Sequence, residues 1–281
     1  MLLAAALDSL ARQTRPPTAV VIVDASAGNE SQELAAKLNA SIPVQYIRAS
    51  EPSAAQQRNL GAEFVTTPLI AFVDDDVVLS EDLFARLVAP FEAENGSHVG
   101  GVAGRIKGLG HPKPRGLLWW YYRVQAGYSH PNFGALLFGP AINTLPCYEE
   151  QSGLVPSGWL NTTCVLYRSD LFARERFPNF EGYSFMEDVH LSARIARTHR
   201  LYFDAEAIYE HKPTPTAFKR DAATYAAAAM RHRRIVATEV MRQRGVGLEI
   251  GMLFHRLLST AALARQRSEG WLNAIGGTWS S

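Results

Sequence analysis

The sequence has very few cysteines. Only Cys147 and Cys164 occur among 281 residues, which excludes a disulfide framework, and the two lack the paired spacing of a zinc site. We therefore expect both thiols to be reduced and the protein to be cytoplasmic. An excess of charge is also lacking, since 28 Lys and Arg residues stand against 27 Asp and Glu residues. This balance argues against a nucleic-acid-binding protein that works through bulk positive charge.

Long hydrophobic runs are absent as well. The opening apolar run, Met1–Leu7, has no Lys or Arg before it and is interrupted by Asp8, so it does not predict a signal peptide. The stretch 246–264 contains Glu249 and Arg256, and no segment offers the roughly 20 uninterrupted apolar residues that span a bilayer. Any membrane contact is therefore expected to be peripheral, at the inner face.

Helical and strand patterns alternate along the first part of the chain. Leu3, Leu7 and Leu10 recur at helical spacing, and the apolar runs 19–23 and 69–73 are typical of strands that are buried on both faces. Hydrophobic residues make up 47% of the chain, as in folded globular domains. This alternation predicts an α/β layered fold, with a largely parallel central sheet flanked by helices.

Three consecutive carboxylates, Asp74, Asp75 and Asp76, follow the buried run 69–73. Ligands of such sheets bind at the carboxyl ends of the strands. Carboxylates this close repel one another unless a cation is bound. Oxygen ligands suit Mg²⁺ or Mn²⁺, and Mg²⁺ commonly takes its remaining ligands from substrate phosphates. The alternative interpretation is a solvated acidic turn without a ligand.

A second acidic pair, Glu187 and Asp188, begins a predicted helix over 187–198. Carboxylates stabilise a helix N-terminus without any chemistry, which is one explanation for the pair. The aromatic segment 182–186 just before it would desolvate a carboxylate and raise its pKa toward that of a general base. The residues alone leave both explanations open.

Taken in order, these segments resemble the family 2 glycosyltransferases of the nucleotide-sugar-dependent, Rossmann-like GT-A fold. The resemblance covers residues 1–211 and rests on the order and spacing of four segments, Val23-Asp24-Ala25-Ser26, Gln57-Arg58-Asn59-Leu60-Gly61, Asp74-Asp75-Asp76 and Glu187-Asp188 with Arg194. It implies a metal-dependent, inverting enzyme that moves a sugar from a nucleotide-diphosphate donor to a hydroxyl acceptor. A UDP-sugar is the most common donor in the family, and surface polysaccharide or glycolipid biosynthesis is the usual setting.

The resemblance also implies roles at the donor site. Asp24 would hydrogen-bond the nucleotide base, and Arg58 and Asp75 would help to bind the donor. Asp74 would reach the ribose or the metal. Asp76 would be the principal ligand of Mn²⁺ or Mg²⁺, with the metal bridging both donor phosphates.

Further roles concern the reaction and the acceptor. Asp188 would act as the catalytic base toward the acceptor, a glycan or a lipid-linked sugar, and Glu187 would lie beside that acceptor. His211 ends a predicted strand and would join the metal site, with a structural histidine as the alternative. Trp159, flanked by Gly158 and Asn161, would stack on an acceptor sugar. The cluster 119–122 could do the same, but core packing explains that cluster at least as well.

The implied organisation has three parts. Residues 1–106 would bind the donor, residues 107–215 would form the acceptor-binding and catalytic half of the same domain, and residues 216–281 would form a helical C-terminal extension. Five arginines of the extension come before the apolar pairs 253–254 and 257–258: Arg231, Arg233, Arg234, Arg242 and Arg244. That stretch would contact anionic lipid or the diphosphate of a lipid-linked acceptor, or it is a solvated helix face.

Members of the resembled family usually have a buried strand ahead of the helix that opens this sequence. The sequence begins inside that helix, so either its start is misassigned or shortened, or the protein closes its sheet in another way. If the strand is truly absent, we expect an open position in the sheet beside the strand that ends at Asp24. Two other functions also fit the residues. One is a nucleotidyltransferase of similar fold, and the other is a non-catalytic protein that binds a sugar nucleotide or a glycan.

Overall fold

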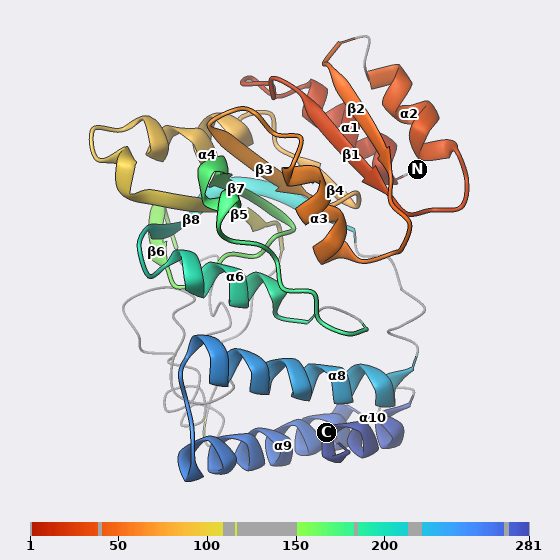
Figure 1. Ribbon diagram of the computed structural model, residues 1–281, viewed down its shortest axis with the longest axis vertical. Coiled ribbons are helices and arrows are strands. Elements are labelled where there is room, and N and C mark those ends of the chain that lie inside the picture. The colour runs from red at the N-terminus through yellow and green to blue at the C-terminus, as the bar shows by residue number, and fades with distance from the viewer. Residues whose placement is uncertain are drawn as a thin grey trace.

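The computed structural model describes residues 2–38, 41–108, 116, 151–182, 185–212, 221–266 and 270–280. An α/β part and a helical part follow one another along the chain (Figure 1). In chain order the elements are α1 (Leu2–Ala11), β1 (Val20–Asp24), α2 (Glu30–Leu38), β2 (Val44–Arg48), α3 (Ala54–Ala62), β3 (Leu69–Val73), β4 (Val77–Leu79), α4 (Leu83–Glu92), η1 (Gly96–His98), β5 (Val99–Ile106), β6 (Leu154–Ser157), β7 (Cys164–Arg168), η3 (Ser169–Ala173), α6 (Glu187–Ile195), β8 (Arg200–His211), α8 (Ala222–Ile235), η4 (Val236–Val240), α9 (Val246–Gln266) and α10 (Trp271–Trp279).

The described strands form two sheets. β1 and β2 pair in parallel as a sheet of their own. The other six strands have the order β3-β7-β5-β8-β4, with β6 also paired to β8. The expected α/β layering is confirmed, but this larger sheet is mixed rather than largely parallel. Among its described strands β5 and β8 form the only parallel pair, because β7 runs antiparallel between β3 and β5, and β4 and β6 both pair antiparallel with β8.

On the edge of β1 that faces away from β2, one backbone carbonyl is capped by a side chain. The Asp24 carbonyl accepts a hydrogen bond from Ala49 N beyond β2, so the alternation along the strand turns the Val23 carbonyl to the opposite edge. There it accepts a hydrogen bond of 2.8 Å from Gln57 Nε2 on α3. Among the described strands β2 is the only partner of β1, and the strand that the resemblance places beside β1 has no counterpart there.

Helices cover both faces of the sheets. The largest core cluster joins strands of both sheets to α1, α2 and α4, and Val77, Leu83 and Leu87 are completely buried in it. A second cluster lies between the larger sheet and α3 and α6. It is built around four aromatic rings whose nearest centroids are 5.1 Å apart: Phe72, Tyr167, Phe172 and Phe177.

The helices α8, α9 and α10 pack together at the end of the molecule away from the sheets (Figure 1). The expected helical extension begins with α8, which is regular only to Ile235. A π-helical turn follows it, and Arg242 then adopts a left-handed φ of 55°. By length and composition alone α9 could cross a membrane, and only 17% of its apolar window is buried inside the protein. The segment is nevertheless interrupted by Glu249 and Arg256, so it is not an unbroken apolar run.

Candidate functional site

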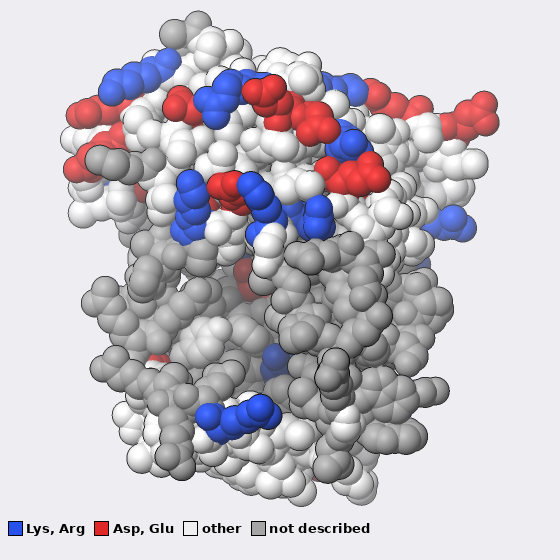
Figure 2. All heavy atoms as spheres, turned by 180° about the vertical axis from the view of Figure 1, so that it is seen from behind, with Lys and Arg blue, Asp and Glu red and all other residues white. Residues whose placement is uncertain are grey.

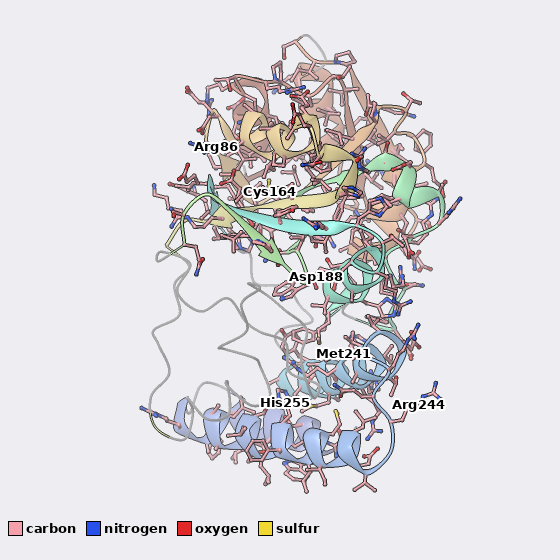
Figure 3. The ribbon with its side chains drawn as sticks, turned by 90° about the vertical axis from the view of Figure 1, so that its left-hand side faces the viewer. Arg86, Cys164, Asp188, Met241, Arg244 and His255 are labelled. Carbon is pink, nitrogen blue, oxygen red and sulfur yellow. The ribbon has the colours of Figure 1, made fainter. Side chains whose placement is uncertain are left out.

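The predicted site residues come together where strands end and α6 begins. Asp24 is the last residue of β1, the triplet 74–76 follows β3 directly, and Glu187 and Asp188 form the first turn of α6. Figure 3 places Asp188 between the sheets and the C-terminal helices. The topology therefore brings together carboxylates that are more than 160 residues apart in the sequence.

Four donors surround the Asp24 carboxylate, three of them at Oδ2 and one at Oδ1. It accepts hydrogen bonds from Ser26 N at 2.9 Å, from Ser26 Oγ at 2.7 Å and from Tyr46 Oη at 2.8 Å, and Arg48 Nη1 lies 3.3 Å away. Burial raises the pKa of Asp24, but these donors outweigh burial and hold the pKa below its usual value. Asp24 therefore stays ionised at neutral pH. Sequence reasoning missed Tyr46 and Arg48, although their alternate positions on β2 put them on one face.

Arg58 connects the two acidic groups. Its Nη2 lies 2.8 Å from Asp74 Oδ1 and its Nη1 lies 3.2 Å from Glu187 Oε1. The guanidinium also sits 5.6 Å from the centroid of the Phe177 ring, and the side chain is only 14% exposed. Burial lowers the pKa of Arg58, but Asp74 and Glu187 together raise it above its usual value. Arg58 thus carries a permanent charge between two carboxylates.

The neighbours of Arg58 hold α3 in place. Asn59 Nδ2 donates to the Phe177 carbonyl and Asn59 Oδ1 accepts from Phe177 N, both at 2.9 Å. Gly61 lies so close to β1 that an added Cβ would be 3.2 Å from Val23 Cγ2. Sequence reasoning assigned this segment to donor binding and missed Phe177, whose backbone and ring both contact it.

Asp76 and His211 face each other across the β4–β8 pair. His211 Nε2 lies 3.3 Å from Asp76 Oδ1, and this oxygen is buried and accepts no hydrogen bond. An unsatisfied buried carboxylate oxygen beside an imidazole nitrogen fits a divalent cation. Within the described residues no group of three or more His, Cys, Asp or Glu side chains could hold a metal. A metal bound here would therefore need further ligands from its substrate.

Asp75 differs from its two neighbours because its side chain is exposed. Partial desolvation, followed by the charges of Asp76 and Asp74, raises the pKa of Asp75. This repulsion within the triplet is the cost that a bound cation would remove.

Asp188 has the most strongly shifted carboxyl group of the site. Burial, followed by the charge of Glu187, raises the pKa of Asp188 to about 7, although Asp188 Oδ1 accepts a hydrogen bond of 2.8 Å from Val189 N. Burial also raises the pKa of Glu187, against the opposite effect of Arg58. A carboxylate with a pKa near neutrality can accept a proton at working pH.

A strained residue fixes the start of α6. Met186 has a φ of 68°, a left-handed conformation that is uncommon for a residue with a side chain, and its side chain is buried. It packs in one cluster with Val189 and Trp159. Trp159 is only 9% exposed, so its ring lies beside the first turn of α6 and is largely covered.

The other residues near the site are structural or lie outside the described part of the chain. Cys164 is a free, buried thiol, as expected. His190 packs in the interior, with its Nε2 3.0 Å from Glu239 Oε2 on η4. The aromatic cluster 119–122 and Cys147 lie outside the described residues.

Comparison with known proteins identifies the family of this chain and solved structures with a similar fold. A model of the family described as glycosyl transferase family 2 matches residues 2–143, just over half of the chain. The crystal structure of S. aureus TarS 1–349 has a TM-score of 0.57 and 17% identity, over 99% of this chain and 76% of that one. The mannosyltransferase PcManGT from Pyrobaculum calidifontis, in complex with GDP-Man and Mn²⁺, has a TM-score of 0.57 and 14% identity, over 99% of this chain and 80% of that one. Among curated proteins, none matches the sequence significantly.

Proposed function

Since the chain belongs to glycosyl transferase family 2 and has the GT-A fold, we propose that it is a metal-dependent, inverting transferase. It would move a sugar from a nucleotide-diphosphate donor to a hydroxyl group of a glycan or a lipid-linked sugar. The observation that supports this proposal is the position of Arg58, which contacts both Asp74 of the acidic triplet and Glu187. Asp188, with its pKa near 7, directly follows Glu187, and Asp76 of the same triplet faces His211.

The donor would bind across the strand ends. Asp24 stays ionised and would accept hydrogen bonds from the N–H groups of the base, while Arg58, Asp74 and Asp75 would contact the rest of the nucleotide. A UDP-sugar is our first choice, and a GDP-sugar is the second. Similar structures include TarS 1–349 in complex with UDP-GlcNAc and PcManGT in complex with GDP-Man.

Asp76 and His211 would hold Mn²⁺ or Mg²⁺. When bound, the metal would neutralise charge on the departing diphosphate. The pair supplies only two ligands, so phosphate oxygens of the donor would complete the coordination, as is common for Mg²⁺. Metal and donor are therefore expected to bind together.

Asp188 would take the proton of the acceptor hydroxyl. The acceptor oxygen would form a bond to the anomeric carbon from the face opposite the diphosphate, while the bond from that carbon to the diphosphate oxygen breaks. This single displacement inverts the configuration. Glu187 assists indirectly, because its charge raises the pKa of Asp188. The free thiol of Cys164 suits a cytoplasmic location, where the enzyme would serve the synthesis of surface polysaccharide or glycolipid.

The test is the Asp188→Asn variant. We expect kcat for transfer or donor hydrolysis to fall by about 10³-fold, within the usual range for loss of a general base. The affinity for UDP with Mn²⁺, measured by calorimetry, should stay within a factor of about two because Asn keeps the shape of the site. The wild-type kcat should fall as the pH drops below about 7, where Asp188 gains a proton.

The exposed Asp170→Asn variant is the matched control, since it removes an equal charge outside the site. It should leave both kcat and UDP affinity unchanged. Saturable binding of UDP or GDP without turnover of any UDP- or GDP-sugar, unaltered by Asp188→Asn, would instead identify a non-catalytic binding protein.

A further inference from the structure

One face of α9 exposes large apolar side chains. Val246, Ile250, Leu253 and Leu257 are between 50% and 75% exposed. Their spacing of three and four residues puts them in one row, which we name the α9 stripe. The row continues through Ala261 and Ala264 without a charged residue. It is therefore an uncharged surface that extends along most of the helix.

The α9 stripe faces away from the rest of the protein. The opposite side of α9 is buried, since Leu248 and Met252 pack in one cluster with Met230 of α8 and Ala237 of η4. Figures 1 and 3 show α9 at the end of the molecule that is farthest from the sheets. The stripe thus occupies an outer surface, not a gap between packed elements.

Positive charge borders the stripe. The extension 216–281 contains ten Lys and Arg residues against four Asp and Glu residues, a net charge of +6, whereas residues 1–215 carry 18 against 23, a net charge of −5. The exposed Arg242 and Arg244 come directly before α9, and Arg265 lies in its last turn. The nearby Glu249 is neutralised by two hydrogen bonds of 2.7 Å from Arg234. Figure 2 shows acidic and basic side chains intermixed over the α/β part and a basic group at the helical end.

An apolar helix face with basic borders matches the surface of an anionic bilayer. A second copy of the chain is a poorer occupant, because a two-fold contact between stripes would bring the arginines of both copies together. A membrane-spanning orientation would put Glu249 and Arg256 into the hydrocarbon core of the bilayer. It would also remove Leu248 and Met252 from the cluster in which they are buried. We propose that the α9 stripe docks on a membrane surface rich in anionic lipid, with α9 in the membrane plane and Arg242 and Arg244 on lipid phosphates.

Vesicle flotation of the full chain, without donor or metal, tests this surface. We expect binding to vesicles of phosphatidylcholine mixed equally with phosphatidylglycerol, weakened by salt, and little binding to phosphatidylcholine alone. Leu253→Glu with Leu257→Glu should lower the partition coefficient by about 100-fold or more. Arg242→Gln with Arg244→Gln should lower it by about 30-fold, as expected for two basic residues at an anionic surface.

Matched changes elsewhere serve as controls. Leu154→Glu alters an apolar side chain of similar exposure (42%) in the sheet, and Arg174→Gln with Arg197→Gln removes two exposed charges outside the extension. These variants should bind vesicles like the wild type, and circular dichroism should show all variants folded.

Three results would overturn the proposal. In the first, the stripe variants still bind the mixed vesicles. In the second, the wild type stays on vesicles after an alkaline carbonate wash, which indicates a spanning helix. In the third, the wild type fails to bind vesicles and the stripe variants only dissociate a dimer. Flotation requires no turnover, so its failure leaves the proposed transferase activity untouched.

Discussion

Arg58 forms ion pairs with two carboxylates that come from distant parts of the chain. Its guanidinium contacts Asp74 Oδ1 and Glu187 Oε1, and Glu187 lies 129 residues away in the sequence. All three side chains are at least 70% buried. Removing one partner of a buried ion pair leaves an uncompensated charge, which costs more than the pair itself contributes. The effect of Arg58 on stability is therefore expected to exceed that of any exposed ion pair.

Replacement of Arg58 by Met keeps an unbranched apolar side chain and removes the charged guanidinium group. We expect Arg58→Met to lower the free energy of unfolding at pH 7 by about 3–5 kcal/mol, because Asp74 and Glu187 lose their shared cation. The control is Arg15→Met, which breaks an exposed pair with Glu92 and should cost less than about 1 kcal/mol. Urea unfolding measures both. Equal losses in the two variants would show that Arg58 stabilises the fold no more than a surface arginine does.

Residue types could be predicted at this site, but their partners could not. The triplet 74–76 and the pair at 187–188 draw attention because adjacent carboxylates are costly without a cation or a reaction to serve. Nothing local in the sequence indicates that Arg58 contacts both groups, since this depends on how α3 and α6 pack on the sheet. Phe177 and Tyr46 were missed for the same reason, because their roles come from contacts over long sequence separations.

At the scale of elements, periodic and continuous apolar patterns located most helices and strands. The strands expected at 19–23 and 69–73 are β1 and β3, and the helix expected from Glu187 is α6. β4 was not predicted, because its three residues follow Asp76 like the continuation of a loop. Its pairing with β8 sets Val77 opposite His211 and so brings His211 to Asp76. Strand pairing is a long-range property, and the mixed direction of the larger sheet escaped prediction for that reason.

The contact between α10 and α8 depends on one of two adjacent glycines. A Cβ added at Gly277 would overlap the Ala223 carbonyl oxygen of α8, whereas a Cβ added at the exposed Gly276 meets nothing. Gly277→Ala is therefore expected to lower the free energy of unfolding by about 1–3 kcal/mol through overpacking. Gly276→Ala is the matched control and should raise it by about 1 kcal/mol, since Ala favours a helix interior.

Thermal unfolding of the two glycine variants measures the difference directly. Opposite shifts of Tm are expected from the same chemical change at neighbouring positions. Shifts of the same sign would mean that α10 does not approach α8 closely at Gly277, and that the helical extension packs in another way.

At the scale of the whole molecule, the two sheets share a core, but among the described strands no ladder of backbone hydrogen bonds joins them. Side chains of both sheets meet in the largest core cluster, while β1 pairs only with β2 among the described strands. The proposed donor would contact Asp24 at the end of one sheet and Asp76 beside the other. A ligand that binds both sheets stabilises their relative position, so donor binding should be visible as increased stability of the entire fold.

This connection predicts a joint effect of nucleotide and metal on thermal stability. UDP or GDP, at about 100 times its Kd and with Mn²⁺, should stabilise the fold by about 2.7 kcal/mol, and EDTA should reverse most of the rise in Tm. Asp76→Asn should abolish the part that depends on Mn²⁺, whereas the exposed Asp170→Asn should not. An undiminished rise in EDTA would contradict a metal at Asp76 and His211. No rise with either nucleotide would contradict a donor site that joins the two sheets, because a ligand bound at both strand ends must oppose their separation.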